Sequence, residues 1–375
     1  MELLKLGTLD HTTRNDTYYI VFYKTLMLDI YAGPAAKKLI QEQGFKQELF
    51  TTMLGASGGP KWFSLFGLDK YLFGEYFKDR REELNLVGSS AGAFRFAALS
   101  QQDPVSAITR LATLYSETTY SAKANKSEIT AKAKTLLEAV LGANGSNEII
   151  NNPIFKAHFI VAKCRGLTTL EQKIPLLLGL MSSMAMNQVN RGLLAKQYQR
   201  YVYHHPKSQL TISDSFNFNT QHQALTNDNL TDSLLASGSI PLIMEGIKDI
   251  IGSPRGMYRD GGIIDYHFDV DIKPAKGLTL YPHFSPTPKA GWFDKNLARK
   301  VNSQYYTNTV MLVPSQEFIA RLPYAKIPDR DDFTNLDAAT RIKYWQTVLS
   351  ESAYLADDFS KLITSSDVTN FKSID

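Results

Sequence analysis

A tight, glycine-flanked turn at residues 88–92, which read Gly-Ser-Ser-Ala-Gly, is the feature that most constrains this chain. Residues 84–87 before it are short and apolar, as in a buried strand, and the small apolar residues after it favour a helix. Gly88 and Gly92 let strand and helix approach where a Cβ would clash. This strand–turn–helix setting is that of the G-x-S-x-G nucleophile elbow, and it predicts Ser90 as a nucleophile at the start of a helix.

A second glycine turn, at residues 57–61, reads Ser-Gly-Gly-Pro-Lys and lies between another expected strand and helix. Backbone amides of Gly58 and Gly59 at a helix start can bind an anion, such as the oxyanion of acyl transfer. Lys61 could add positive charge. A phosphate-binding loop is the competing interpretation, although Trp62 follows the lysine where the nucleotide-binding pattern requires serine or threonine.

A third block places Asp260 directly before Gly261 and Gly262. An aspartate followed by two glycines is, taken alone, typical of a turn. Its interest comes from its position after the other two blocks, because a serine nucleophile needs a group that accepts its proton.

Taken in this order, the three blocks resemble the patatin-like phospholipase family. The segment 236–241, Ala-Ser-Gly-Ser-Ile-Pro, also looks like the block that precedes the family's aspartate. The resemblance implies a serine–aspartate dyad without histidine, with Ser90 as nucleophile and Asp260 as its partner. It further implies that the Gly58 and Gly59 amides form the oxyanion hole. Supporting motif positions are Gly88, Gly92, Lys61, Gly261 and Gly262, whereas Ser57 and Trp62 stand where the family has glycines.

The function expected from this set is a lipid acyl-hydrolase of the phospholipase A or esterase type, acting through an acyl-Ser90 intermediate. An aspartate of ordinary pKa is a weak base, so we expect burial to raise the pKa of Asp260. Two alternatives stay open. One is a Ser-His-Asp triad that uses His267 or His283, and the other is a catalytically silent scaffold with the same fold.

Metal and cofactor sites are not expected. Asp265, His267, Asp269 and Asp271 alternate and could share one strand face, but solvent-facing polar residues are the favoured interpretation. The single cysteine, Cys164, excludes an intramolecular disulfide and a cysteine-based zinc cluster.

The expected fold is α/β: a three-layer sandwich with a mostly parallel central sheet, a nucleophile elbow and an inserted helical cap. The alternation of strands and helices over residues 48–100 favours parallel strands with crossovers. We expect one domain over all 375 residues, with the cap at about 103–200 and an amphipathic C-terminal helix at about 337–363.

Composition limits the partners. The net charge is +4, and the densest charged segment, 78–83, mixes both signs, so nucleic-acid binding is not expected. No signal peptide is evident, and the uncharged run at 174–190 is too short and too polar to span a bilayer. The sequence therefore predicts a soluble, cytoplasmic protein. Its partners are a lipid or ester substrate and, through the apolar run, a membrane surface.

Overall fold

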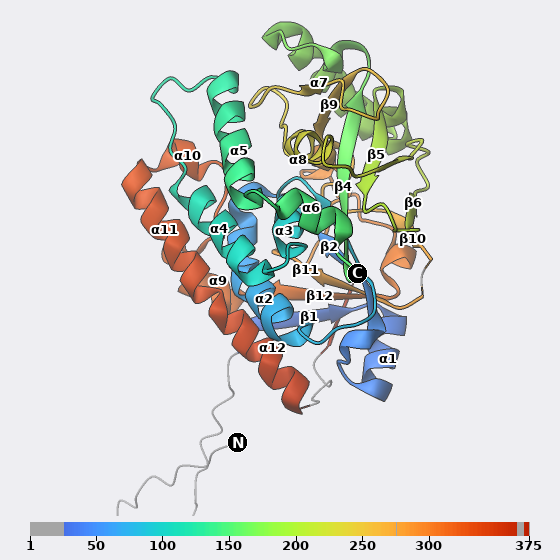
Figure 1. The fold of residues 1–375 in the computed structure, drawn as a ribbon, viewed down its shortest axis with the longest axis vertical. Coiled ribbons are helices and arrows are strands. Elements are labelled where there is room, and N and C mark those ends of the chain that lie inside the picture. Colours follow the sequence, from blue (N-terminus) through green and yellow to red (C-terminus); the bar gives the residue numbers. More distant parts are fainter. Residues whose placement is uncertain (1–25, 275, 366–370, 375) are drawn as a thin grey trace, which may run out of the picture.

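The computed structural model describes residues 26–274, 276–365 and 371–374. It is an α/β three-layer sandwich with a mostly parallel central sheet (Figure 1). The main path of the sheet has the order β13-β1-β12-β11-β2-β3-β4-β5-β7. Its strands are β1 (Leu28–Ala32), β2 (Phe50–Gly55), β3 (Leu84–Ser89), β4 (Phe155–Cys164), β5 (Tyr198–His204), β7 (Gln221–Ala224), β11 (Leu278–Pro282), β12 (Thr309–Pro314) and β13 (Lys372–Ser373). The short strands β8 (Ile247–Lys248) and β9 (Met257–Asp260) join it at β4, and β6 (Thr211–Ser213) pairs separately with β10 (Asp271–Lys273).

Five neighbouring strands, β12, β11, β2, β3 and β4, run parallel and form the centre of the sheet. Antiparallel strands flank them, because β1 pairs with β12 and β5 pairs with β4 in the opposite direction. In open α/β sheets, binding sites lie at the carboxyl ends of the parallel strands. In this chain the loops after β2 and β3 leave from that edge.

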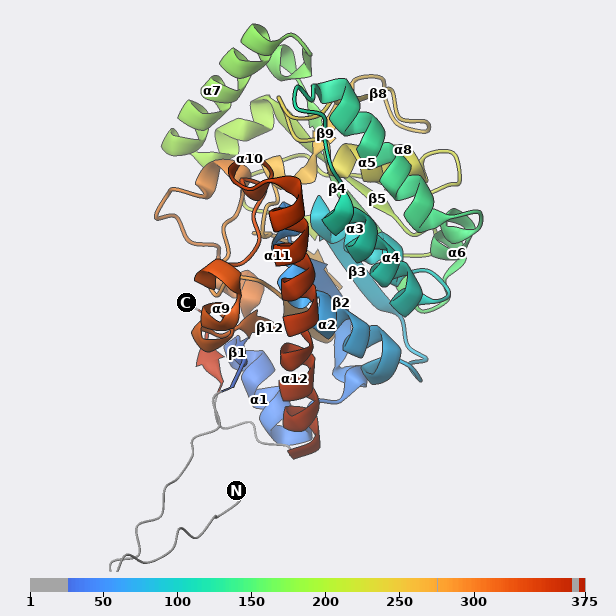
Figure 2. The same ribbon diagram turned by 90° about the vertical axis from the view of Figure 1, so that its left-hand side faces the viewer.

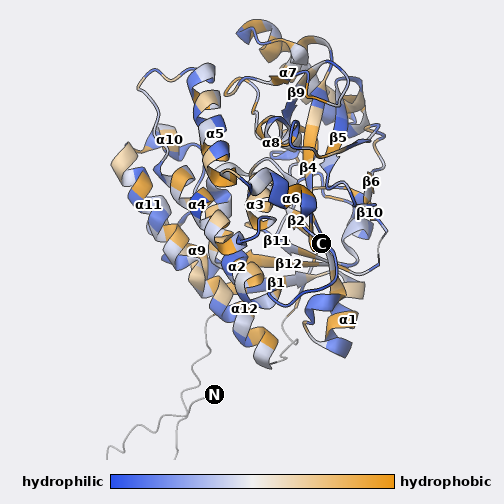
Figure 3. Ribbon diagram, in the orientation of Figure 1, coloured by the Kyte–Doolittle hydropathy of each residue, from blue (hydrophilic) through white to orange (hydrophobic). Residues whose placement is uncertain are grey.

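The helices pack on and around this sheet (Figure 2). They are α1 (Pro34–Gln43), α2 (Phe66–Tyr71), α3 (Ala91–Leu99), α4 (Pro104–Glu117), α5 (Lys126–Leu141), α6 (Gly145–Asn151), α7 (Lys173–Val189), α8 (Leu230–Ser237), α9 (Gln316–Arg321), α10 (Asp332–Asn335), α11 (Ala338–Glu351) and α12 (Ala353–Ser365). Along α4 and α11, hydrophobic and hydrophilic residues alternate, as expected of helices with one buried face (Figure 3).

Successive side chains of the central strands enter two different hydrophobic cores. Met53 of β2 and Leu86 of β3 join the core that contains α2, α3 and α12. Their neighbours Leu54 and Val87 join a second core on the other face, together with aromatic side chains from residues 268–306. Both faces of the parallel strands are therefore buried, which explains their nearly continuous apolar sequence.

The expected strand–helix alternation over residues 48–100 is confirmed, because β2 and β3 are adjacent and parallel and α3 follows the elbow. The single helix expected after the glycine loop is divided. It consists of the 3-10 helix η2 (Gly59–Leu65), α2, and a π-helical turn, η3 (Leu72–Tyr76). The aromatic and branched residues at 18–30 predict one or two strands; β1 is observed at Leu28–Ala32, and residues 18–25 lie outside the described residues.

The segment 103–200 does not form a separate helical cap, because parts of it belong to the helical layer and to the sheet. α4 packs on α2 and α3 within the helical layer, and β4 is a central strand of the sheet. The residues from 174 to 201 predict a helix, but the observed helix α7 ends at Val189 and β5 begins at Tyr198. The sequence of β5, Tyr-Gln-Arg-Tyr-Val-Tyr-His, is rich in residues that favour strands, and pairing along the whole of β4 fixes it as one.

The C-terminal helix expected at 337–363 is observed as two consecutive helices, α11 and α12, that meet at Ser352. Its start is as the sequence predicts, because the Asp337 side chain accepts a hydrogen bond from the Thr340 amide. At the junction, the Ser352 hydroxyl accepts a hydrogen bond from the Gly67 amide at 2.8 Å. Within residues 26–365, apart from residue 275, none of the helices combines the length and apolar character that crossing a membrane requires.

Candidate active site

Two strands reach the same point of β4 from opposite directions, and this brings two distant residues together. β3 runs parallel to β4 until Ser89 lies opposite Ile160. β9 runs antiparallel to β4 along the next residues, and its last residue, Asp260, lies opposite Val161. The turn after β3 and the end of β9 therefore meet, although 170 residues separate Ser90 from Asp260.

Ser90 occupies a strained turn between β3 and α3. Its backbone has φ 53° and ψ −121°, a conformation that residues with a Cβ rarely adopt. A Cβ at Gly92 would lie 1.8 Å from the Gly55 carbonyl oxygen, so the close packing of α3 on β2 depends on this glycine. The Ser90 amide donates a hydrogen bond to the Ser237 hydroxyl at 2.9 Å, which holds the turn against α8.

The Ser90 hydroxyl donates a hydrogen bond to Asp260 Oδ2 at 2.8 Å. The other carboxylate oxygen accepts the Gly262 amide at 2.7 Å, so both oxygens are held in place. Asp260 is 6% exposed. Burial raises the pKa of its carboxyl to about 6, against the opposing hydrogen bonds from Gly262 and Ser90. The arrangement can pass the serine proton to a carboxylate that is a stronger base than an ordinary aspartate.

The glycine loop lies against this pair. Gly58 and Gly59 have φ values of 157° and 57°, which are left-handed conformations that favour glycine. The preceding Ser57 amide is occupied, since it donates to the Tyr266 carbonyl at 2.9 Å. Among the described residues, neither glycine amide donates to another backbone carbonyl. These two amides are therefore available to an oxyanion that forms beside Ser90.

A shallow pocket joins these parts. It is lined by Ser57, Gly58, Gly59, Ser90, Ile240, Pro241, Asp260, Gly262, Ile263, Tyr266, Trp292 and Arg330. The lining combines the serine, the carboxylate and the glycine loop with apolar side chains from the segment before β9 and from the loops after it. Gly262 is needed for this closeness, because a Cβ there would lie 2.6 Å from the Ser57 hydroxyl. Gly88 and Gly261 pack equally closely against backbone of their neighbours.

Lys61 has a different place from the one that the sequence suggested. Its ammonium group forms an ion pair with Asp329, in the loop before α10, instead of facing the serine. The charge of Lys61 is thereby neutralised within the protein, and the pair fixes the loop 326–331 to the glycine loop. This geometry also disfavours the phosphate-binding interpretation, because the lysine of such a loop must be free to reach a phosphate.

Two cations of the site, Arg330 and Lys295, carried no local sequence signal. Arg330 reaches the pocket because Lys61 holds its neighbour Asp329, and Lys295 lies over the Tyr266 ring at 4.2 Å. Both cations lower the pKa of Asp260, although less than burial raises it. Their loops come from parts of the chain in which no motif was recognised, so only the fold could identify them.

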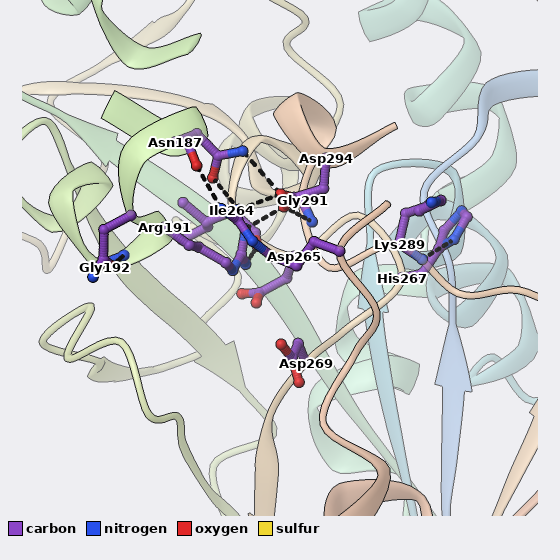
Figure 4. A network of polar contacts seen from close by, with 12 residues as sticks. Asn187, Arg191, Gly192, Ile264, Asp265, His267, Asp269, Lys289, Gly291 and Asp294 are labelled. Atoms are coloured by element: carbon purple, nitrogen blue, oxygen red, sulfur yellow. Dashed lines mark hydrogen bonds and ion pairs between the residues drawn. The ribbon is translucent and has the colours of Figure 1, made fainter. Parts of the chain in front are cut away.

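A buried polar network supports the segment after Asp260 (Figure 4). Asp294, in the short helix η7 (Trp292–Asp294), accepts hydrogen bonds from Arg191 at 2.9 Å and from Asn187 of α7 at 2.8 Å. Arg191 also donates to the Ile264 carbonyl. Because η7 carries Trp292, this network connects α7 to the wall of the pocket.

The histidines expected in the alternative triad have other partners. His267 Nδ1 accepts a hydrogen bond from the Lys289 amide at 2.9 Å, and His283 Nδ1 accepts one from the Ser285 amide at 2.9 Å. Burial lowers the pKa of His283 to about 3 and that of His267 well below its ordinary value. Both rings are therefore neutral, and no hydrogen bond joins either to the serine–aspartate pair.

The expectation of solvent-facing strand residues at 265–271 is wrong, because Asp265, His267 and Asp269 are buried and β10 begins only at Asp271. Asp265 pairs with Arg200, and Asp269 accepts the Asn302 amide at 2.8 Å. Asp271 pairs with Lys273 in β10. In the part of the chain that the structure describes, His, Cys, Asp and Glu side chains form no group of three that could hold a metal.

The fold and site together define an α/β protein with a buried hydroxyl–carboxylate pair at the carboxyl end of its parallel strands. No protein-family model matches the sequence, and neither does any curated protein. Among solved structures, the chain is similar to VipD from Legionella pneumophila, with 12% sequence identity and a TM-score of 0.30. The match covers 72% of this chain and 55% of that one, so the chain spans about half the length of VipD.

Proposed function

We propose that this protein is a serine hydrolase that cleaves carboxylic esters of lipids, with Ser90 as nucleophile and Asp260 as general base. The single observation that carries the proposal is the 2.8 Å hydrogen bond from the Ser90 hydroxyl to Asp260, in a strained turn beside two available glycine amides. A silent scaffold has no need for this strain, which costs about 1–3 kcal/mol, or for a buried carboxylate.

The proposed reaction has two halves. Ser90 Oγ attacks the ester carbonyl carbon and passes its proton to Asp260 Oδ2, while the Gly58 and Gly59 amides stabilise the oxyanion. The bond to the alcohol then breaks, and the alcohol leaves with that proton. A water molecule next gives a proton to Asp260 and attacks the acyl-serine, which releases the carboxylic acid and restores the Ser90 hydroxyl.

Helix α7 supports a lipid as the substrate. Ile174, Leu177, Leu178, Met181 and Met184 form one face of the helix and are each between 42% and 72% exposed. The opposite face is buried and includes Ser183 and Asn187, which are hydrogen-bonded. A continuous apolar face exposed to water is unfavourable for a protein, and a bilayer surface would cover it. Helix α7 lies at one end of the molecule (Figures 1 and 2), and we propose that it rests on that surface and that its contact with η7 keeps the pocket nearby.

A fluorophosphonate probe, which phosphonylates activated serines, tests the nucleophile. We expect the wild-type protein to be labelled at Ser90 and to hydrolyse a soluble ester. Ser90→Ala should lose both properties and keep the fold by circular dichroism. Ser89→Ala is the matched control, because the Ser89 hydroxyl lies toward Ser57, at 3.1 Å, rather than toward the carboxylate. Labelling that persists in folded Ser90→Ala would refute the assignment.

The membrane contact is tested by comparing two substrates. The double variant Leu178→Glu, Met181→Glu should hydrolyse an ester in phospholipid vesicles more slowly and a soluble ester at the wild-type rate. Leu26→Glu is the control, since Leu26 is also exposed but lies next to β1, at the other end of the molecule from α7. An equal loss on vesicles in both variants would contradict a specific role of α7.

A further inference from the structure

Arg330 is a cation in the wall of the pocket for which the described part of the chain offers no hydrogen-bond or ion-pair partner. It shares that wall with Ser90 and Asp260. Its alkyl chain is held close to the glycine loop, since a Cβ at Gly59 would lie 2.9 Å from Arg330 Cγ. The adjacent Asp329 is already paired with Lys61. Among the described residues, the Arg330 guanidinium group forms neither a hydrogen bond nor an ion pair.

Lys295 is a second cation close to the pocket, and among the described residues its ammonium group forms no hydrogen bond or ion pair. It follows η7, and its ammonium group lies 4.2 Å from the centre of the Tyr266 ring, another wall residue. Burial and the nearby charge of Arg330 lower the pKa of Lys295 to about 8. Two like charges that are partly withdrawn from water lose hydration and repel each other. An anion bound between them would reduce both the cost of desolvation and the repulsion.

Among the described residues, most buried arginines are neutralised by a carboxylate, whereas Arg80 and Arg341 donate to backbone carbonyls. Arg95 pairs with Asp69 at 2.6 Å, and Arg191 pairs with Asp294 at 2.9 Å. Arg200 pairs with Asp265 at 2.6 Å. Such pairing is the rule, because an unpaired buried charge is costly. Arg330 and Lys295 are half-buried in the pocket region and, among the described residues, have no carboxylate partner, so an anion from outside the chain would stabilise both charges.

The charged groups around the pocket carry a net positive charge. Lys61 and Asp329 cancel each other, which leaves Arg330 and Lys295 against the single carboxylate of Asp260. We propose that Arg330 and Lys295 form an anion-binding subsite, so that the ester cleaved at Ser90 carries a negatively charged phosphate or carboxylate group near its scissile bond. This inference rests on the proposed hydrolase function and specifies its substrate class.

The experiment compares soluble esters that share the acyl chain and the three-carbon alcohol and differ in whether they carry an anionic group. The octanoyl esters of glycerol, of glycerol 3-phosphate and of glyceric acid are used as monomers, so that no lipid surface contributes. We expect a higher kcat/KM for the charged esters than for the neutral one. The phosphate and carboxylate arms show which anion the subsite prefers. Because each charged hydrogen bond contributes about 1.5–3 kcal/mol, the preference should be about tenfold or more.

Variants assign this preference to the two cations. Arg330→Gln and Lys295→Gln should each reduce the ratio of charged to neutral kcat/KM by about tenfold, mainly through KM, whereas Arg330→Lys should keep part of it. Arg81→Gln is the charge-matched control, because Arg81 is exposed and precedes β3 at the opposite edge of the sheet from Ser90. Its ratio should equal that of the wild type.

The outcomes separate this inference from the function on which it rests. If the wild type hydrolyses all esters at similar kcat/KM, the anion subsite is refuted while the hydrolase stands. The subsite is likewise refuted if Arg330→Gln lowers kcat/KM equally for charged and neutral esters, because Arg330 would then act on the transition state that all the esters share. If no ester is hydrolysed and the fluorophosphonate probe does not label Ser90, the proposed function itself fails.

Discussion

Replacing Asp260 by asparagine separates the chemistry of the site from its shape. Asparagine has the same size, and its oxygen can still accept the Gly262 amide, which now lies 2.7 Å from Asp260 Oδ1. Its amide group would face Ser90 where the carboxylate now accepts a proton. The variant therefore removes the base and keeps the geometry, so ester hydrolysis should fall by about 10²–10⁴-fold.

The buried carboxylate also makes a prediction about stability. Its pKa is 3.8 in a model peptide and about 6 in the folded protein. That difference corresponds to about 3 kcal/mol, at about 1.4 kcal/mol for each pH unit. Between these two values the folded protein binds more protons than the unfolded chain, so stability falls as the pH rises from about 4 through about 6. Asparagine cannot ionise, so Asp260→Asn should be more stable than the wild type above pH 6.

The assay is a pair of pH series on the same samples. Wild-type kcat/KM should increase with pH and level off above about 6, as Asp260 ionises. The melting temperature of Asp260→Asn should exceed that of the wild type by more at pH 8 than at pH 5. Asp79→Asn is the control, because Asp79 is exposed and its loss should leave both profiles unchanged. Near-native turnover in folded Asp260→Asn, or an unchanged melting difference across the series, would refute the reasoning.

Three further predictions follow from single residues. His267→Asn and His283→Asn should each keep fluorophosphonate labelling within about tenfold of wild type, whereas loss of a true triad histidine would cost several orders of magnitude. Gly92→Ala should give little folded protein in a solubility and circular dichroism assay, because its Cβ would lie 1.8 Å from the Gly55 carbonyl oxygen. Cys164 should react with a thiol reagent only after unfolding, since burial raises the pKa of its thiol to about 12.

Local patterns in the sequence were sufficient for the elements that their own residues specify. The elbow at residues 88–92, with a strand before it and a helix after it, is observed where the glycines and apolar residues predicted it. The same holds for β2, the strand expected before the glycine turn at residues 57–61, because a short apolar run has few other stable conformations in a core. The parallel sheet was predicted for the same reason.

Local patterns failed where two conformations were nearly equal in preference. The uncharged stretch that begins at Ile174 continues helical spacing past its true end at Val189, so the start of β5 at Tyr198 was missed although its residues favour a strand. Pairing with β4, a strand more than thirty residues earlier, decided that conformation. Lys61 was misjudged for a similar reason, since its partner Asp329 is 268 residues away.

The sequence by itself determined that a serine would stand in a strained turn at the end of a parallel strand. The residues that surround this serine were decided only by the tertiary structure. Asp260 meets Ser90 because β9 lies antiparallel on β4, directly beyond the end of β3. Arg330 reaches the pocket because an ion pair fixes its loop to the glycine loop. Turn geometry depends on the few residues that form it, whereas a site depends on contacts between segments that are far apart along the chain.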